Sequence, residues 1–120
     1  GARFVNLQYG DVADDIAKAR DAFGADVVSL PDVDVFDDVD GLLSIIMACD
    51  AVVTIDNATA HLAGAAGKPT LLLLPAHETT WYWQNSNDRS IWYPSLRIFR
   101  QTIPGDWSGP ITRIAEALKR

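Results

Sequence analysis

The chain has 120 residues, of which 48% are hydrophobic and 22% are charged. This length and composition predict one globular domain and exclude a disordered or fibrous protein. The formal net charge of -6 argues against a nucleic-acid binder, because such proteins gather Lys and Arg against the phosphates. A small basic pocket for one phosphate group remains compatible with this charge.

Cys49 is the single cysteine, so the chain has neither an intrachain disulfide nor a zinc cluster built on cysteines. We expect a buried structural thiol in a reducing compartment, and therefore a cytoplasmic protein. The longest apolar run, residues 70–75, is too short to span a bilayer, so we expect no transmembrane segment. We likewise expect no secretory signal.

The first part of the chain predicts a strand, a helix and a second strand. Residues 4–7 are typical of a strand, Asp11 is placed to cap a helix, and Gly24 is placed to end it. Residues 27–30 form the second strand, and an acidic, irregular stretch over residues 32–40 follows. A second amphipathic helix is marked by Leu42, Ile45, Ile46 and Cys49.

Strand and helix candidates alternate over the rest of the chain as well. Residues 51–55 form a β-branched run without alternation, which is typical of a parallel strand covered on both faces. A helix of small residues over 58–66 and an apolar strand over 70–74 follow. A long aromatic loop over residues 75–94 precedes a short strand at residues 96–99.

The final helix begins at Ser108 or Gly109, just before Pro110. We expect its buried stripe to consist of Ile111, Ile114, Ala115 and Leu118. The alternation of strands and helices predicts an open, mostly parallel, Rossmann-like α/β sheet with right-handed crossovers. Ligands bind such sheets beyond the carboxyl ends of the strands.

One of these strand ends favours a phosphate site. Asp56 and Asn57 follow the buried strand and can cap the next helix, whose first-turn N–H groups and dipole attract an anion. Ala58 is small enough to let a phosphate approach the backbone, and His61 lies about one turn into the helix. In the alternative interpretation, Asn57 only caps the helix and His61 is a half-buried histidine with its hydrogen bonds satisfied.

Five aromatic residues gather in the loop over residues 75–94. They are Trp81, Tyr82, Trp83, Trp92 and Tyr93. Such rings stack on sugars and nucleobases, and they also pack against a partner domain. On either interpretation we expect Trp81, Trp83 and Trp92 to be more exposed than core tryptophans.

Two longer segments resemble a known family. Residues 51–69, AVVTIDNATAHLAGAAGKP, resemble the Asp-Thr-x-x-x-His-Leu-Ala-Gly-Ala-x-Gly-x-Pro segment of the heptosyltransferase-like glycosyltransferases. Residues 92–101, WYPSLRIFRQ, and residues 105–107, GDW, resemble the bacterial branch of that family that follows tetratricopeptide repeats. The strand ends at residues 7–8 and 30–31 also fit, so the resemblance covers nearly the whole chain.

The resemblance implies the C-terminal half of a GT-B glycosyltransferase, which binds a nucleotide diphosphate sugar with neither a metal ion nor a cofactor. It implies that the substrate-binding residues are Gln8, Asp56, Asn57, Ala58 and His61. Asn57, Ala58 and the following amides would hold phosphate, and His61 would support it. Asp56 would contact the sugar or orient the loop. Asn57 stands where family members usually carry Thr, so its side chain has a different reach.

The resemblance also implies partners within one longer protein. These are an N-terminal half, which carries the acceptor site and any catalytic base, and helical repeats. We therefore expect a fragment that is inactive alone and that begins at the second strand of its half. Without the first strand, residues 4–7 are expected to pair directly with residues 51–55; otherwise a neighbouring chain fills the slot.

The alternative function is a non-catalytic binding or interaction module, which Asn57 favours. Binding of a nucleotide diphosphate with transfer of its sugar to an acceptor would separate the two. A flavodoxin-like or receiver domain is a weaker alternative, because the chain lacks the acidic pocket after a first strand that a receiver needs.

Overall fold

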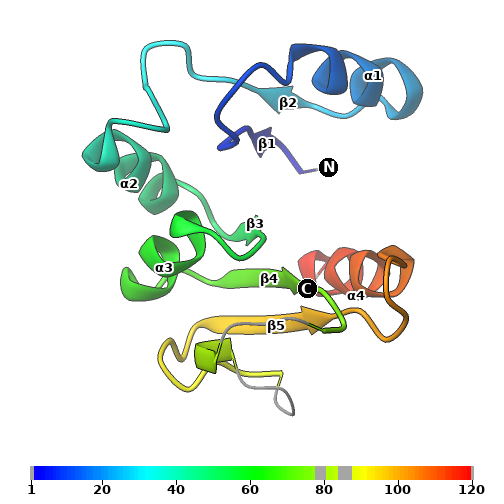
Figure 1. Ribbon diagram of the computed structural model, residues 1–120. Coiled ribbons are helices and arrows are strands. Elements are labelled where there is room, and N and C mark those ends of the chain that lie inside the picture. Colours follow the sequence, from blue (N-terminus) through cyan, green and yellow to red (C-terminus); the bar gives the residue numbers. More distant parts are fainter. Residues whose placement is uncertain (1, 78–80, 84–87, 120) are drawn as a thin grey trace. The chain divides into compact units, whose positions relative to one another are not determined.

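The computed structural model describes residues 2–77, 81–83 and 88–119. The chain divides into two compact units, Gly1–Ile45 and Ile46–Arg120. Figure 1 shows the elements of both units, coloured in chain order.

The first unit contains a small parallel β-α-β arrangement. β1 (Phe4–Val5) pairs in parallel with β2 (Val27–Val28), and α1 (Ala13–Phe23) connects them (Figure 1). The Phe4 amide donates to the Asp26 carbonyl at 2.8 Å, which extends the ladder at one end. Both predicted strands therefore exist, but each is shorter than predicted, because the ladder joins only two residue pairs.

The ends of α1 lie close to the predicted positions. Gly24 adopts the left-handed conformation with φ at 64° and ends the helix, as predicted. At the other end the N-cap position is Val12, one residue later than predicted. The Asp11 carboxylate nevertheless accepts a hydrogen bond from the Ala13 amide at 3.1 Å, so it still serves the first turn.

α2 (Val39–Ala48) contains the point at which the two units divide. Leu42, Ile45 and Ile46 are buried, as their helical spacing predicts. Cys49 lies just after the helix and is a free, half-buried cysteine, so the predicted full burial of this thiol is not found.

The second unit contains a three-stranded parallel sheet in the order β3-β4-β5. Its strands are β3 (Val52–Thr54), β4 (Thr70–Leu74) and β5 (Leu96–Arg100). Its helical segments are α3 (Ala58–Ala65), η1 (Trp81–Trp83) and α4 (Ser108–Leu118). Within the predicted aromatic loop, residues 78–80 and 84–87 lie outside the described residues.

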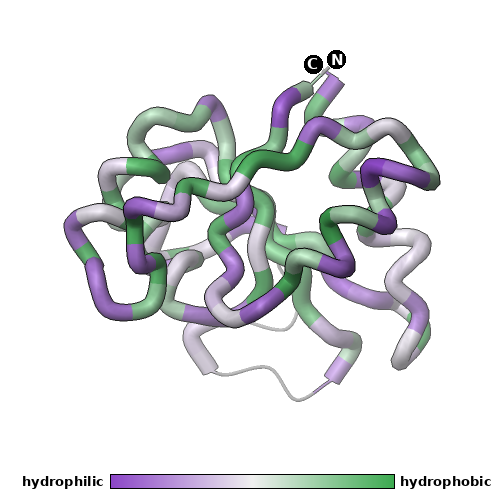
Figure 2. The backbone as a smooth tube through the Cα atoms, turned by 90° about the horizontal axis from the view of Figure 1, so that it is seen from above, coloured by the Kyte–Doolittle hydropathy of each residue, from purple (hydrophilic) through white to green (hydrophobic). Residues whose placement is uncertain are grey.

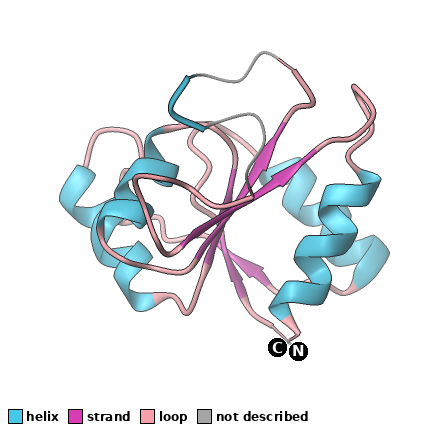
Figure 3. Ribbon diagram, turned by 90° about the horizontal axis from the view of Figure 1, so that it is seen from below, coloured by secondary structure: helices cyan, strands magenta, loops and turns pink. Residues whose placement is uncertain are grey.

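β4 is the central strand of this sheet and is covered on both faces. Leu72 and Leu74 pack on one face with Ala60 of α3, whereas Leu71 packs on the other face with Ile114 of α4. Because successive strand residues point to opposite faces, α3 and α4 cover opposite sides of the sheet (Figure 3). This double cover explains the continuous apolar run that predicted the strand.

The buried stripe of α4 differs from the prediction. Three of the four residues predicted for it are exposed: Ile111, Ala115 and Leu118. The helix instead packs through Pro110, Ile114 and Ala117. These three positions also lie on one helical face, and contact with β5 and β4 selects that face over the neighbouring one.

β1 pairs with β2 within the first unit, and β3 pairs with β4 within the second. The predicted direct pairing of residues 4–7 with residues 51–55 would join the two units, so it stays a prediction.

Parallel strands that alternate with helices confirm the predicted α/β class with Rossmann-like connections. Figure 2 shows hydrophilic and hydrophobic residues interspersed along the backbone. Within residues 2–77, 81–83 and 88–119, no helix combines the length and apolar composition that crossing a membrane requires.

Candidate functional site

The connection from β3 to α3 and the first half of α3 together carry four of the five predicted site residues: Asp56, Asn57, Ala58 and His61. Asn57 is extended and caps α3, because its side-chain oxygen accepts a hydrogen bond from the Ala60 amide at 3.2 Å. The Thr54 hydroxyl donates to the same oxygen at 3.0 Å. These two bonds fix the Asn57 amide group, and its NH₂ is the part that remains able to donate to a ligand.

The first turn of α3 presents backbone donors. The N–H groups of Ala58 and Thr59 have no hydrogen-bond acceptor in the described part of the chain. They lie at the positive end of the helix dipole, where an anion is stabilised. Asp56, just before them, is exposed and carries a carboxylate, which suits a hydroxyl partner better than a phosphate.

His61 is held in place by aromatic rings. Its Nδ1 lies 2.9 Å from the Tyr93 hydroxyl, and its ring stacks on Trp83 with the centroids 5.2 Å apart. The Tyr82 ring meets the imidazole edge-on at 5.1 Å. When the Tyr93 hydroxyl donates to Nδ1, Nε2 carries the ring proton and is the atom that can donate to an anion.

Tyr93 reaches His61 because two features fix its position. A Cβ placed on Gly64 would lie 2.5 Å from Tyr93 Cγ, so only glycine lets the ring pack this closely against α3. The Ser90 hydroxyl oxygen also accepts the Tyr93 amide at 3.0 Å, which orders the turn before the ring. The sequence did not identify Tyr93 as the partner of His61, because the two residues lie 32 positions apart.

The tryptophans of the loop divide into two groups. Trp81 and Trp92 are 73% and 54% exposed, as predicted, and their rings meet edge-to-face at 6.0 Å. The prediction is wrong for Trp83, which is 1% exposed. Its indole fills the core beside Leu72 and Leu74, and the Arg100 guanidinium donates to its carbonyl at 3.0 Å.

The Arg100 side chain reaches this aromatic core through its bond to the Trp83 carbonyl. Partial burial lowers the pKa of its guanidinium, because leaving water disfavours the charged form. Arginine nevertheless stays charged at neutral pH, and its bond to the Trp83 carbonyl ties β5 to η1.

Gln8 belongs to a different unit from the other four predicted site residues. It follows β1 in the first unit, whereas Asp56, Asn57, Ala58 and His61 all belong to the second. Its backbone amide donates to the Asn6 side-chain oxygen at 3.0 Å, and its own amide NH₂ donates to the Tyr9 carbonyl at 3.3 Å. Gln8 also lines a hollow within the first unit.

Among the described residues, no group of three or more His, Cys, Asp or Glu side chains lies close enough together to hold a metal ion. The donors gathered at α3 are instead N–H groups, which bind anions and hydroxyl oxygens. N–H groups at the start of a helix are able to bind anions, and aromatic rings lie beside His61 on the same helix.

Comparison with known proteins gives one informative similarity. The chain is similar to Protein FlbA of Caulobacter vibrioides, with 36% of residues identical over 119 residues. The alignment covers 99% of this chain but only 20% of FlbA, so the chain spans about a fifth of the length of the curated relative it matches. No protein-family model matches the chain, and no solved structure does.

The predicted membership in the heptosyltransferase-like glycosyltransferases is therefore wrong. The similar curated protein is FlbA, and no glycosyltransferase family model matches. The motif that led to the assignment encodes a strand, a capped turn, a helix of small residues and a Gly-x-Pro stop. These are the requirements of a tightly packed strand–turn–helix, which parallel α/β sheets of many families share.

Proposed function

We propose that the start of α3 binds the diphosphate of a nucleotide diphosphate sugar, as the donor-binding part of a metal-independent glycosyltransferase. The observation that carries this proposal is the fixed His61 ring, tied through Nδ1 to Tyr93 and lying one turn into a capped helix. The N–H groups of Ala58 and Thr59 lie at the head of the same helix.

The proposed chemistry is electrostatic. When a sugar leaves its nucleotide, negative charge develops on the diphosphate, and fixed donors stabilise that charge without having to reorganise. The α3 amides, the Asn57 NH₂ and His61 Nε2 would supply these donors in place of a metal ion. Ala58 has a single methyl group, so it leaves the backbone accessible to a phosphate.

The exposed rings support a second contact. Trp81 and Trp92 belong to the same unit as α3, and both are more than half exposed. Indole faces stack on nucleobases and pack on the C–H faces of sugars. We propose that one of these two rings covers the base or the sugar of the donor.

Transfer itself would require parts of a longer protein. The acceptor site and the catalytic base are proposed to lie outside these 120 residues, so this chain should bind the donor but not transfer its sugar. A cytoplasmic location belongs to the same proposal, because the free Cys49 suits a reducing compartment.

A second candidate is a non-catalytic binding module. It is favoured by Asn57, whose side-chain oxygen is already engaged by Ala60 and Thr54 and is therefore committed to holding the helix end. In this case the site would bind a diphosphate or a sugar, and the full-length protein would transfer nothing to an acceptor.

Calorimetric titration of the chain with UDP, GDP and dTDP tests the proposal. Asn57→Asp keeps the capping oxygen but replaces the NH₂ donor with negative charge, so the fold should survive while diphosphate affinity falls about tenfold or more. His61→Phe keeps the ring packing, removes both nitrogens and should also weaken binding.

His77→Ala is the matched control, because His77 is exposed and lies on the loop after β4. Equal affinity in wild type, Asn57→Asp and His61→Phe would reject the site. Diphosphate binding by the full-length protein without sugar transfer would support the second candidate instead.

A further inference from the structure

The first unit contains a hollow of about 340 Å³ at the carboxyl ends of β1 and β2. This volume is at the lower end of the range for small-ligand pockets, which is about 300–1,000 Å³. In parallel α/β sheets, ligands bind beyond this edge of the strands. The hollow lies entirely within the first unit, and none of its lining residues belongs to α3 or to the aromatic loop.

The two strand ends are joined by a hydrogen bond between side chains that line the hollow. The Asn6 NH₂ donates to the Ser29 hydroxyl at 3.3 Å, and the Asn6 side-chain oxygen accepts the Gln8 backbone amide at 3.0 Å. Asn6, Gln8 and Ser29 all line the hollow. The side chain of each can exchange hydrogen bonds with a neutral polar ligand.

Two carboxylates face the same hollow, and each uses one oxygen in its own turn. Asp11 Oδ1 accepts the Ala13 amide at 3.1 Å, and Asp34 Oδ1 accepts the Phe36 amide at 3.0 Å. The second oxygen of each carboxylate has no hydrogen-bond partner within residues 2–77, 81–83 and 88–119. These oxygens are the strongest acceptors on the lining.

The charge of the lining selects against anions. It contains two Asp and neither Lys nor Arg, and the first turn of α1 adds Asp14 and Asp15. A phosphate would be repelled here, in contrast to the start of α3. The hollow is instead suited to a ligand that donates several hydrogen bonds.

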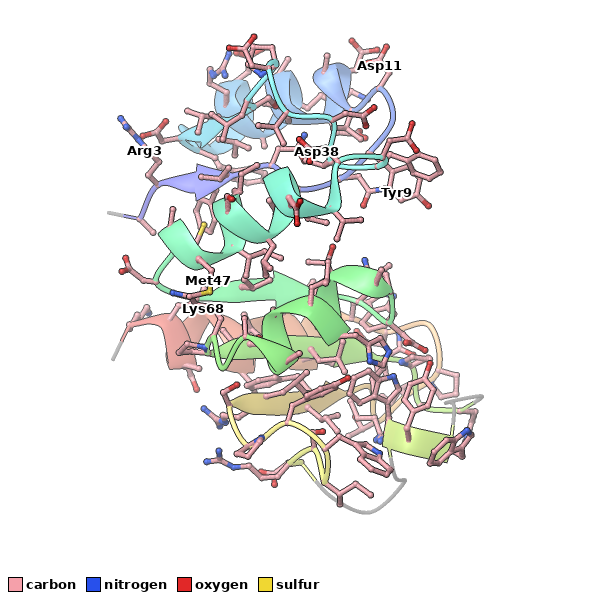
Figure 4. All side chains as sticks on the ribbon, turned by 90° about the vertical axis from the view of Figure 1, so that its left-hand side faces the viewer. Arg3, Tyr9, Asp11, Asp38, Met47 and Lys68 are labelled. Carbon is pink, nitrogen blue, oxygen red and sulfur yellow. The ribbon has the colours of Figure 1, made fainter. Side chains whose placement is uncertain are left out.

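An aromatic pair borders the hollow. The rings of Tyr9 and Phe36 lie 5.0 Å apart at a tilt of 60°, and both side chains are exposed. Figure 4 shows Tyr9 and Asp11 at the edge of this unit toward which β1 leads. Exposed aromatic faces beside carboxylate and amide acceptors are suited to the two surfaces of a sugar, its C–H face and its hydroxyl rim.

We propose that this hollow binds a neutral saccharide ring. Asp11 and Asp34 accept its hydroxyl groups through their second oxygens, Asn6, Gln8 and Ser29 complete the polar wall, and Tyr9 or Phe36 packs on the ring face. This site differs from the proposed anion site at α3 in charge, in its hydrogen-bonding groups and in the unit that carries it.

NMR titration of the isotopically labelled chain with glucose, galactose and N-acetylglucosamine tests the proposal. We expect amide shifts confined to residues 6–13 and 29–36, with dissociation constants on the order of millimolar. Asp11→Asn and Asp34→Asn keep the oxygen that serves each turn, and each should weaken saccharide binding about tenfold. Asp21→Asn, on α1 but outside the hollow, removes the same charge and should leave binding unchanged.

Three results would overturn the proposal. The first is the absence of shifts in these segments with every saccharide up to about 100 mM, well above the expected dissociation constants. The second is binding of choline or ethanolamine with no response to the sugars, because the hollow would then bind cations. The third is equal loss of binding in Asp21→Asn and Asp34→Asn.

Discussion

The two units of the chain differ in how they are stabilised and in what they can attract. Among the described residues of the first unit only Leu42 and Ile45 are buried, whereas the second unit buries β4 on both faces between α3 and α4. The first unit has ten Asp against three Lys or Arg, whereas the second has six acidic and seven basic residues. The acidic charge of the chain is therefore concentrated in its first unit.

This difference underlies the separate ligands that we propose for the two units. A surplus of carboxylates repels phosphates but accepts hydroxyl groups, so the acidic hollow fits a neutral ligand. Near-neutral charge, together with free helix amides, permits an anion at α3. The packed core of the second unit also fixes Tyr93 and His61, whereas the hollow of the first unit is bordered by exposed rings. Preorganised donors are thus expected in the second unit only.

The largest expected effect comes from opening the core of the second unit. Leu72 is fully buried between Ala60 and the strands, so Leu72→Ala should lower the free energy of unfolding by about 2–5 kcal/mol. Phe23→Ala removes a larger side chain from the first unit, but Phe23 is 85% exposed and its loss should cost no more than about 0.5 kcal/mol. Urea unfolding of both variants measures the contrast, and equal losses would contradict it.

Gly64→Ala is expected to have a smaller effect that tests the contact between α3 and Tyr93. The new methyl group would meet Tyr93 Cγ at 2.5 Å, which should destabilise the chain by about 1–3 kcal/mol. In a Tyr93→Ala background the clash is absent, and the same change should stabilise the helix by up to about 1 kcal/mol, since Ala favours helix over Gly. Thermal unfolding of the four proteins in this cycle gives the coupling. An unchanged sign in the Tyr93→Ala background would show that the ring does not oppose the methyl group.

The elements were predictable from the sequence where local chemistry determines them. Gly24 and Gly67 adopt left-handed conformations just after helices, which only glycine adopts without strain, so the helix ends could be predicted. The apolar run of β4 and the cap at Asn57 are equally local signals. The polar residues at the strand ends could therefore be named as site candidates before the structure was known.

The features that the sequence did not predict depend on tertiary packing. Trp83 and Trp81 lie two residues apart in one loop, and no periodicity distinguishes the buried ring from the exposed one. In α4 two neighbouring apolar stripes fit the helical period. The stripe through Ile114 and Ala117 is the one that packs on the sheet. The hydrogen bond between His61 and Tyr93 joins positions 32 residues apart, so neither residue alone reveals it.

The smallest expected effect concerns pH and the first turn of α4. The Asp106 carboxylate accepts hydrogen bonds from the Ser108 hydroxyl at 2.6 Å and from the Ser108 amide at 3.0 Å. These bonds favour the charged form, so they lower the pKa of Asp106 below its ordinary value of 3.8. A lowered folded-state pKa contributes stability that is present above the ordinary pKa and is lost as the pH falls through the folded-state value.

Asp106→Asn isolates this contribution, because Asn cannot gain or lose the charge but still offers an oxygen to the Ser108 amide. Wild type should be slightly more stable than Asp106→Asn at pH 5, and the gap should close as the pH falls from about 4 toward 2. Other carboxylates titrate in the same range in both proteins, so the difference between their unfolding midpoints, followed by circular dichroism, is the quantity to measure. The Ser108→Ala variant lacks the hydroxyl donor. In that background, the stability difference caused by Asp106→Asn should therefore change less with pH. A gap that stays constant or widens on acidification would mean that the carboxylate is not held by Ser108 in solution. Since α4 covers one face of β4 through Ile114, a closing gap would also show that this helix end is coupled to the cooperative core of the second unit.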